Sequence, residues 1–247
     1  MPGRSVISKL LECTNSWTLS VDRGNPVDVV YLDFKKAFDC VPHGRLIHKL
    51  EFYGVRGQLL NWITDFLSGR GCRVLVGGEY SERYHTSRGV PQGSVLAPLL
   101  FNIYTADIAL GLDSQISSFE DDTMIYNNPV THFNELASDL QRIERWCKDW
   151  LLDLNENKCS ILHIGTNNPR RHYTLNNQMI KTVSSQEDLG VVVSADLRRA
   201  PHVGKVVKRV NSMSYMISRT FTNPSPKLLE KSTRSTLDLL WTMQQWC

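Results

Sequence analysis

The sequence predicts an α+β protein built on a split β-α-β-β-α-β unit, the ferredoxin-like arrangement. Three observations support this class: an apolar segment VDVVYLDF that suits a strand buried on both faces, an acidic hairpin, and a long helix with one apolar side. The predicted order is strand 27–33, helix 95–110, hairpin 115–126, helix 132–151 and strand 159–164. In this order the ends of the two central strands lie side by side.

The composition is that of a globular protein of one or two domains. The chain has 247 residues, of which 41% are hydrophobic and 21% charged. No apolar run reaches the roughly 18 residues that span a bilayer, and the first residues lack the core of a signal peptide. We therefore expect an intracellular protein that is not secreted and has no membrane partner. The 6 cysteines and 7 histidines show no metal-ligand or disulfide spacing.

Charge is unevenly distributed along the chain. Residues 1–150 hold 15 basic and 18 acidic side chains, whereas residues 151–247 hold 13 and 7. Between Arg198 and Arg234 there are nine basic residues and one acid. This cluster is typical of a surface that follows phosphates, and a merely soluble basic face explains the charge equally well.

The first third of the chain alternates helices with one buried strand. An amphipathic helix is predicted at 7–19, and the strand at 27–34 delivers Asp33 at its end. Two packing helices without chemistry of their own follow at 43–54 and 57–69. The pair Gly77-Gly78 then favours a hairpin turn between short strands.

The loop RGVPQGS, residues 88–94, precedes the next helix. Its last residue, Ser94, is placed to cap that helix, and Pro98 is tolerated in the first turn. The helix is apolar nearly all round, which predicts burial on every side. Its N-terminus directs backbone N–H groups at whatever the loop holds, and anions favour such ends.

The acidic hairpin carries the main candidate site. Strands are predicted at 115–119 and 123–126, with Asp121 and Asp122 in the tight turn between them. Adjacent carboxylates repel each other and are best tolerated where a cation lies between them. A solvated acidic turn is the alternative. The split strand order allows Asp33 to converge on this turn.

The remaining segments predict short strands at 173–183 and 188–193 and two helices. The first helix, 202–221, has an apolar stripe, and Lys205, Lys208 and Arg209 face away from it. The second helix spans 226–240.

Five blocks occur in order along the chain: VVYLDFKKAFDCVP, RGVPQGSVLAPLLFNIY, FEDDTMIY, LNENKCSILHIG and EDLGVVV. Together they resemble the reverse transcriptase of non-long-terminal-repeat retrotransposons, the jockey-like and related LINE-type elements. The resemblance covers about Gly3 to Leu240. The resemblance implies a polymerase palm in residues 1–197 with a fingers-type insertion at about 43–87, followed by the start of a helical thumb at 198–247. We expect truncation at both ends, with fingers and endonuclease normally supplied by the same polyprotein.

The resemblance also implies a metal and nucleotide site. Asp33, Asp121, Asp122 and the main-chain carbonyl of Phe34 would hold two Mg²⁺ ions, with Mn²⁺ as a substitute. Phe38 takes the position of the gate that excludes a ribose 2′-hydroxyl, and a core phenylalanine is its alternative.

Further roles follow from the same resemblance. Gln92 and Gly93 lie in the loop that contacts the nucleotide, and Lys158 stands where a basic residue is suggested to protonate pyrophosphate; a surface lysine is its alternative. Arg88 and the basic face of 202–221 would contact nucleic acid. The implied partners are an RNA template, a DNA primer and a deoxynucleoside triphosphate, with the nucleus as location by family analogy.

One residue departs from the family pattern. The position before Asp121 is commonly alanine, and here it is Glu120. A third acid there could repel the triphosphate or misplace a metal, or it could turn to solvent. Two alternatives to an active polymerase remain. One is a non-catalytic remnant that binds nucleic acid through residues 198–234, and the other is an unstable relic. A group II intron maturase fits the blocks less well.

Overall fold

The computed structural model describes residues 6–220. They divide into two compact units, and the boundary lies between residues 183 and 184. The first unit is organised on a five-stranded sheet of order β11-β8-β1-β7-β6. Its strands are β1 (Val27–Leu32), β6 (Gln115–Phe119), β7 (Asp122–Asn127), β8 (Ser160–Ile164) and β11 (Lys181–Val183). β1 is antiparallel to β7 and β8, β6 is antiparallel to β7, and β11 is parallel to β8.

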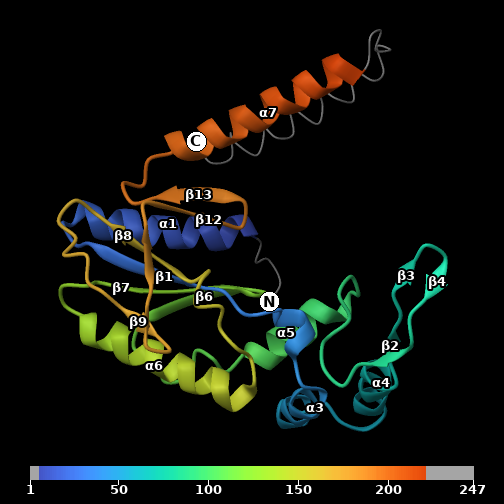
Figure 1. Ribbon diagram of the computed structural model, residues 1–247. Helices are drawn as coiled ribbons and strands as arrows, with labels where there is room; N and C mark the ends of the chain where they lie inside the picture. The colour runs from blue at the N-terminus through green and yellow to red at the C-terminus, as the bar shows by residue number, and fades with distance from the viewer. Residues whose placement is uncertain (1–5, 221–247) are drawn as a thin grey trace. The chain divides into compact units, whose positions relative to one another are not determined.

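This sheet confirms the predicted split order. α5 (Leu96–Thr105) lies between β1 and β6 in the sequence, and α6 (Phe133–Trp150) lies between β7 and β8. β1 and β8, the first and last strands of the split β-α-β-β-α-β order, are neighbours, and the hairpin of β6 and β7 pairs with the other side of β1. α6 covers one face of the sheet, and α1 (Val6–Asp22) covers the opposite face (Figure 1).

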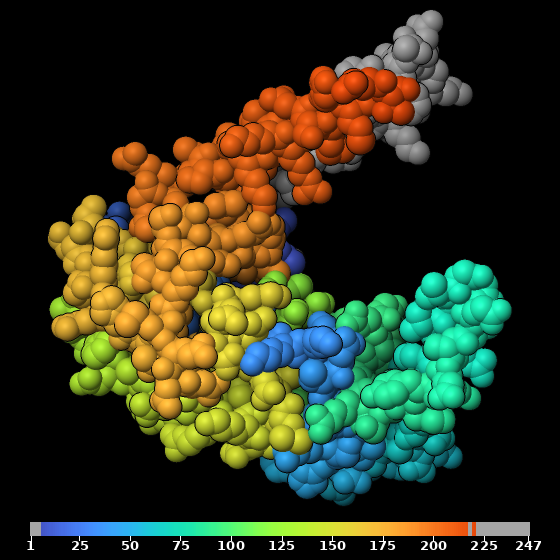
Figure 2. Space-filling model, in the orientation of Figure 1, coloured from blue at the N-terminus to red at the C-terminus, as the bar shows by residue number. Residues whose placement is uncertain are grey.

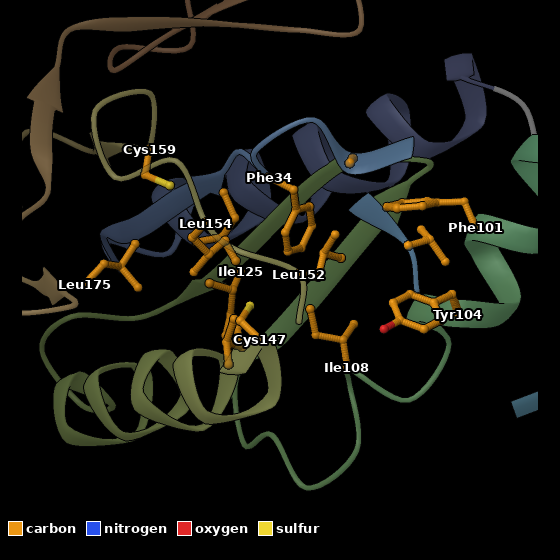
Figure 3. Close-up of a cluster of buried hydrophobic side chains, with 14 of the residues drawn as sticks. Phe34, Phe101, Tyr104, Ile108, Ile125, Cys147, Leu152, Leu154, Cys159 and Leu175 are labelled. Carbon is orange, nitrogen blue, oxygen red and sulfur yellow. The ribbon is translucent and has the colours of Figure 1, made fainter. Parts of the chain in front are cut away.

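Burial on both faces explains the uninterrupted apolar sequence of β1. All six of its residues are buried, as the sequence predicts. Val30 and Leu32 join the core that also contains Ile125 of β7 and apolar residues of α5 and α6. Figure 3 shows Phe34, Leu152 and Leu154 among the side chains of this core. On the α1 side, Trp17 packs edge-on against Tyr126 with the ring centroids 5.6 Å apart.

An insertion of helices and short strands follows β1. Its helices are α2 (Ala37–Cys40), α3 (His43–Phe52) and α4 (Gly57–Leu67). Its strands are β2 (Gly71–Cys72), β3 (Leu75–Val76), β4 (Glu79–Tyr80) and β5 (Tyr84–His85). Gly77 and Gly78 both have positive φ, 59° and 91°, which confirms the predicted hairpin turn. The hairpin projects from the helices in Figure 1.

A buried lysine ties this insertion to the sheet-covering helices. Lys49 of α3 is 3% exposed, and its ammonium donates to the Tyr104 carbonyl and forms an ion pair with Asp107. The same ammonium lies 3.6 Å from the centroid of the Trp150 ring on α6. Three helices therefore meet around one cation.

The prediction of a fully buried helix at 95–110 is wrong in length and in burial. The helix ends at Thr105 and continues as turns, in which the Ile108 N–H donates to the Thr105 carbonyl. Only one side packs against the core, so Val95 is 95% and Leu99 55% exposed. The apolar composition of the helix could not predict this exposure, because burial depends on which sides of α5 other elements cover.

The first unit also contains a two-stranded sheet, in which β9 (Thr174–Leu175) pairs with β10 (Gln178–Met179). The second unit contains the hairpin β12 (Ser185–Asp188) and β13 (Val191–Ser194) and the helix α7 (Ala200–Thr220). The helix predicted at 226–240, with its basic residues, lies outside the described residues. No helix within residues 6–220 has the length and apolar character needed to cross a membrane.

Candidate functional site

The register of the central strands brings the predicted acids together. Leu32, the last residue of β1, pairs with Thr123 of β7 in an antiparallel ladder. Asp33 directly follows Leu32 and Asp122 directly precedes Thr123, and the Asp33 carboxylate acts electrostatically on the Asp122 carboxyl. Two acids 89 positions apart in the sequence are therefore neighbours.

The position of the tight turn is corrected by one residue. Phe119 pairs with Asp122, so the two-residue turn consists of Glu120 and Asp121, and Asp122 belongs to β7. Glu120 adopts φ 54°, in the left-handed region. Two-residue hairpin loops favour positive φ because this matches the twist of the strands. The closure of the ladder, rather than the pair of acids, sets where the turn lies.

The electrostatics of the acids match a crowded anionic site. Partial burial and the charge of Asp121 raise the pKa of the Asp122 carboxyl; the Lys9 ammonium opposes this rise and the Asp33 carboxylate adds to it. Lys9 of α1 also donates a 3.1 Å hydrogen bond to the Asp122 main-chain carbonyl. One carboxylate oxygen of Asp33, Oδ2, is buried without a hydrogen-bond partner and lies 3.8 Å from the Lys158 ammonium.

A pocket of about 750 Å³ opens beside these acids. It is bounded by the end of β1 with α2, by the loop before α5, by the turn of the acidic hairpin, and by the segment before β8. The lining residues are Asp33, Phe34, Lys36, Ala37, Phe38, Gln92, Gly93, Ser94, Val95, Ala97, Pro98, Glu120, Asp121 and Lys158. Figure 2 shows the light-blue segment after β1 and the green segment with the loop side by side on the visible face.

The aromatic side chain of Phe38 serves the core and the pocket at once. Its ring stacks on Phe101 with centroids 4.9 Å apart and packs against the hydrophobic core, and it also lines the pocket. Both roles considered for this residue are therefore compatible with its position.

The loop at 88–94 is held by its own cap and by α2. The Ala97 N–H donates to the Ser94 hydroxyl at 3.1 Å, which confirms the predicted cap. The Val90 N–H donates to the Phe38 carbonyl at 2.7 Å. These bonds place Gln92 and Gly93 at the pocket wall.

The pocket gathers most, but not all, of the predicted site residues. Asp33, Phe34, Phe38, Gln92, Gly93, Asp121 and Lys158 line it, and Asp122 adjoins it. Arg88 is exposed at the start of the loop. Lys205, Lys208 and Arg209 belong to the second unit, where Lys205 forms an ion pair with Glu187. Their roles stay predictions.

Two charged residues at the site, Lys9 and Asp39, were not assigned such positions from the sequence, whereas Glu120 was. Lys9 has no local signal, because the fold alone brings it from α1 to β7. Asp39 is an acid six positions after Asp33, and its hydrogen bond to Gln92 could not be read from spacing. Glu120 was identified as a departure, and it lies in the pocket wall with an intermediate exposure.

Solved structures of telomerase share the fold of this chain. Telomerase from Candida tropicalis in complex with a fragment of telomeric RNA superposes with a TM-score of 0.55 at 10% identity, covering 96% of this chain and 42% of that one. Telomerase from Candida albicans gives 0.55 at 15% identity, covering 77% and 33%. At this identity the likeness shows the fold alone, which is polymerase-like.

The family follows from sequence. The protein-family model of the reverse transcriptase (RNA-dependent DNA polymerase) matches residues 8–216. The chain belongs to this family. The probable RNA-directed DNA polymerase from transposon BS of Drosophila melanogaster is 28% identical over 229 residues, 84% of this chain and 24% of that protein. The polymerase from mobile element jockey of Drosophila funebris is 27% identical over 206 residues, 76% and 22%. The chain thus spans about a quarter of the length of these curated relatives.

Proposed function

We propose that the pocket beside Asp33 and Asp121 is the polymerisation site of a retrotransposon reverse transcriptase. It would extend a DNA primer on an RNA template with deoxynucleoside triphosphates, and priming on chromosomal DNA would place the protein in the nucleus. The observation that carries the proposal is the convergence of Asp33 with the 121–122 acids at one end of the sheet. Membership of the family supports it.

The acids suit divalent magnesium. Within residues 6–220 no three His, Cys, Asp or Glu side chains are grouped closely enough to hold a metal by themselves. Magnesium, however, is commonly held by one or two carboxylates with substrate phosphates completing its coordination. Asp33 Oδ2, which is buried without a hydrogen bond and has only the Lys158 ammonium at 3.8 Å, and the raised pKa of Asp122 both favour a cation there. Asp33, Asp121, Asp122 and the Phe34 carbonyl are the proposed ligands, and Mn²⁺ is the proposed substitute.

The bound metal would lower the pKa of the primer 3′-hydroxyl and offset charge on the leaving oxygens. The protein's own side chains would orient the nucleotide and exclude the wrong sugar. Phe38, fixed by its stack on Phe101, would form the floor against which a deoxyribose packs and a 2′-hydroxyl clashes. Lys158, with a 69% exposed side chain, would be free to reach a leaving pyrophosphate and give it a proton.

Primer extension with the purified chain tests the proposal. The assay contains an RNA template, a labelled DNA primer, deoxynucleoside triphosphates and Mg²⁺. We expect extension that falls by at least about a hundredfold in Asp33→Asn. Asp65→Asn, an exposed acid on α4, is the matched control and should extend like the wild type.

One observation favours a second function, a non-catalytic nucleic-acid-binding module. Glu120 adds a third acid to the pocket wall, where a triphosphate would be repelled. In that case the wild type would not extend a primer. It would bind an RNA–DNA duplex with strong salt dependence, indifferent to Mg²⁺ and to Asp33→Asn, because phosphate contacts release counterions.

A further inference from the structure

The loop that carries Gln92 is docked on α2 and on the residues that follow it, as far as the start of α3. The Gly89 N–H donates to the Val41 carbonyl at 2.8 Å, and the His43 ring nitrogen Nε2 lies 2.8 Å from the Gly89 carbonyl oxygen. A side chain at Gly89 would meet the Asp39 carbonyl oxygen at 2.9 Å, and Gly89 has φ 92°. The loop and α2 are therefore in close backbone contact.

Within this docked loop, the Gln92 side chain has a single polar partner among the described residues. Its amide nitrogen Nε2 donates to Asp39 Oδ1 at 3.0 Å. Gln92 lines the pocket, whereas Asp39 does not. Asp39 therefore does not contact a molecule in the pocket directly, and its hydrogen bond to Gln92 is its link to the pocket wall.

The chemistry of the partner decides which end of the amide faces the ligand. A glutamine amide presents a carbonyl oxygen that accepts and an NH₂ group that donates. An ionised carboxylate only accepts, so it binds the NH₂ end and leaves the oxygen Oε1 free. A neutral partner such as asparagine accepts or donates and does not select an orientation.

We propose that Asp39 is a positioning residue that fixes the Gln92 amide with its acceptor oxygen available to the nucleotide. The pocket would then favour a hydrogen-bond donor on the sugar or base at this point. The inference rests on the proposed function of the pocket and names a residue that sets its specificity. When a nucleotide covers the hydrogen bond between Asp39 and Gln92, water competes less for the Gln92 amide. The bond then holds the amide in its orientation more strongly.

A double-mutant cycle on nucleotide kinetics tests this. Asp39→Leu removes the acceptor at similar volume and should raise the KM for the nucleotide about five- to tenfold with a smaller change in kcat. Asp39→Asn keeps an acceptor and should raise KM less. In the Gln92→Leu background, Asp39→Leu should have no further effect on KM. An equal rise in KM with and without Gln92 would overturn the proposal.

A measurement that needs no catalysis separates this proposal from the proposed function. The side-chain amide signals of Gln92, assigned by their loss in Gln92→Leu, are compared by NMR in wild type and Asp39→Leu. We expect slower hydrogen exchange in the wild type, because the NH₂ group is bonded. Identical signals in both proteins would refute the role of Asp39. Absence of primer extension with distinct signals would instead refute only the polymerase.

Discussion

Replacing Asp28 by alanine should lower the free energy of unfolding by about 3–5 kcal/mol. Asp28 is 0% exposed in β1, and its carboxylate accepts hydrogen bonds from His163 Nδ1 at 2.7 Å, Asn168 Nδ2 at 2.8 Å and Tyr173 Oη at 2.9 Å. The donors come from β8 and the segment that follows it. This acid therefore joins the central strand, five residues before Asp33, to its neighbour.

The magnitude follows from what each donor loses. Asn168 Nδ2 also donates to the carbonyls of Val27 and Ile164, so it keeps partners in the variant. His163 and Tyr173 are buried and lose their bonds to Asp28, at about 1–3 kcal/mol for each unsatisfied group and so about 2–6 kcal/mol for both, which brackets the roughly 3–5 kcal/mol of breaking a buried charged pair. The sum is a large part of a typical stability of about 5–15 kcal/mol.

Urea unfolding followed by circular dichroism measures this loss. The melting temperature should fall by about 6–20 °C for a unit of this size. Asp65→Ala, an exposed acid on α4, should change stability by less than about 0.5 kcal/mol. If Asp28→Ala stays within about 1 kcal/mol of the wild type, the cost of burying the carboxylate cancels its hydrogen bonds, and the reasoning is wrong.

Three further perturbations follow from the structure. Burial and the charge of Asp28 raise the pKa of Tyr173 above its ordinary value of 10.0, so the stability contributed by the neutral hydroxyl is complete below that pH and is lost above it. Tyr173→Phe should flatten the decline in unfolding free energy above about pH 10, and an unchanged slope would contradict this. Gly89→Ala should reduce primer extension about tenfold by displacing the loop from Asp39, whereas Gly111→Ala, also at positive φ but in open space, should not; equal rates would show that the contact is unimportant. Glu120→Ala and Glu120→Gln should both lower the KM for the nucleotide by removing a charge from the pocket wall, and an unchanged KM would mean that this carboxylate does not face the triphosphate.

The order of the elements could be predicted from the amino-acid sequence alone. Local patterns carry this information: the uninterrupted apolar run of β1 requires cover on both faces, and the helical spacing of 132–151 requires one buried side. The order then predicted that Asp33 and the 121–122 acids converge, and the register confirms it.

Features that depend on contacts between distant segments are visible only in the folded structure. It placed the turn at Glu120 and Asp121, because strand pairing fixes the residues that close a hairpin. It left one side of α5 uncovered, since burial depends on which surfaces meet and not on composition. It also brought Lys9 to Asp122 and Asp39 to Gln92, 113 and 53 positions away, by folding rather than by any spacing in the chain.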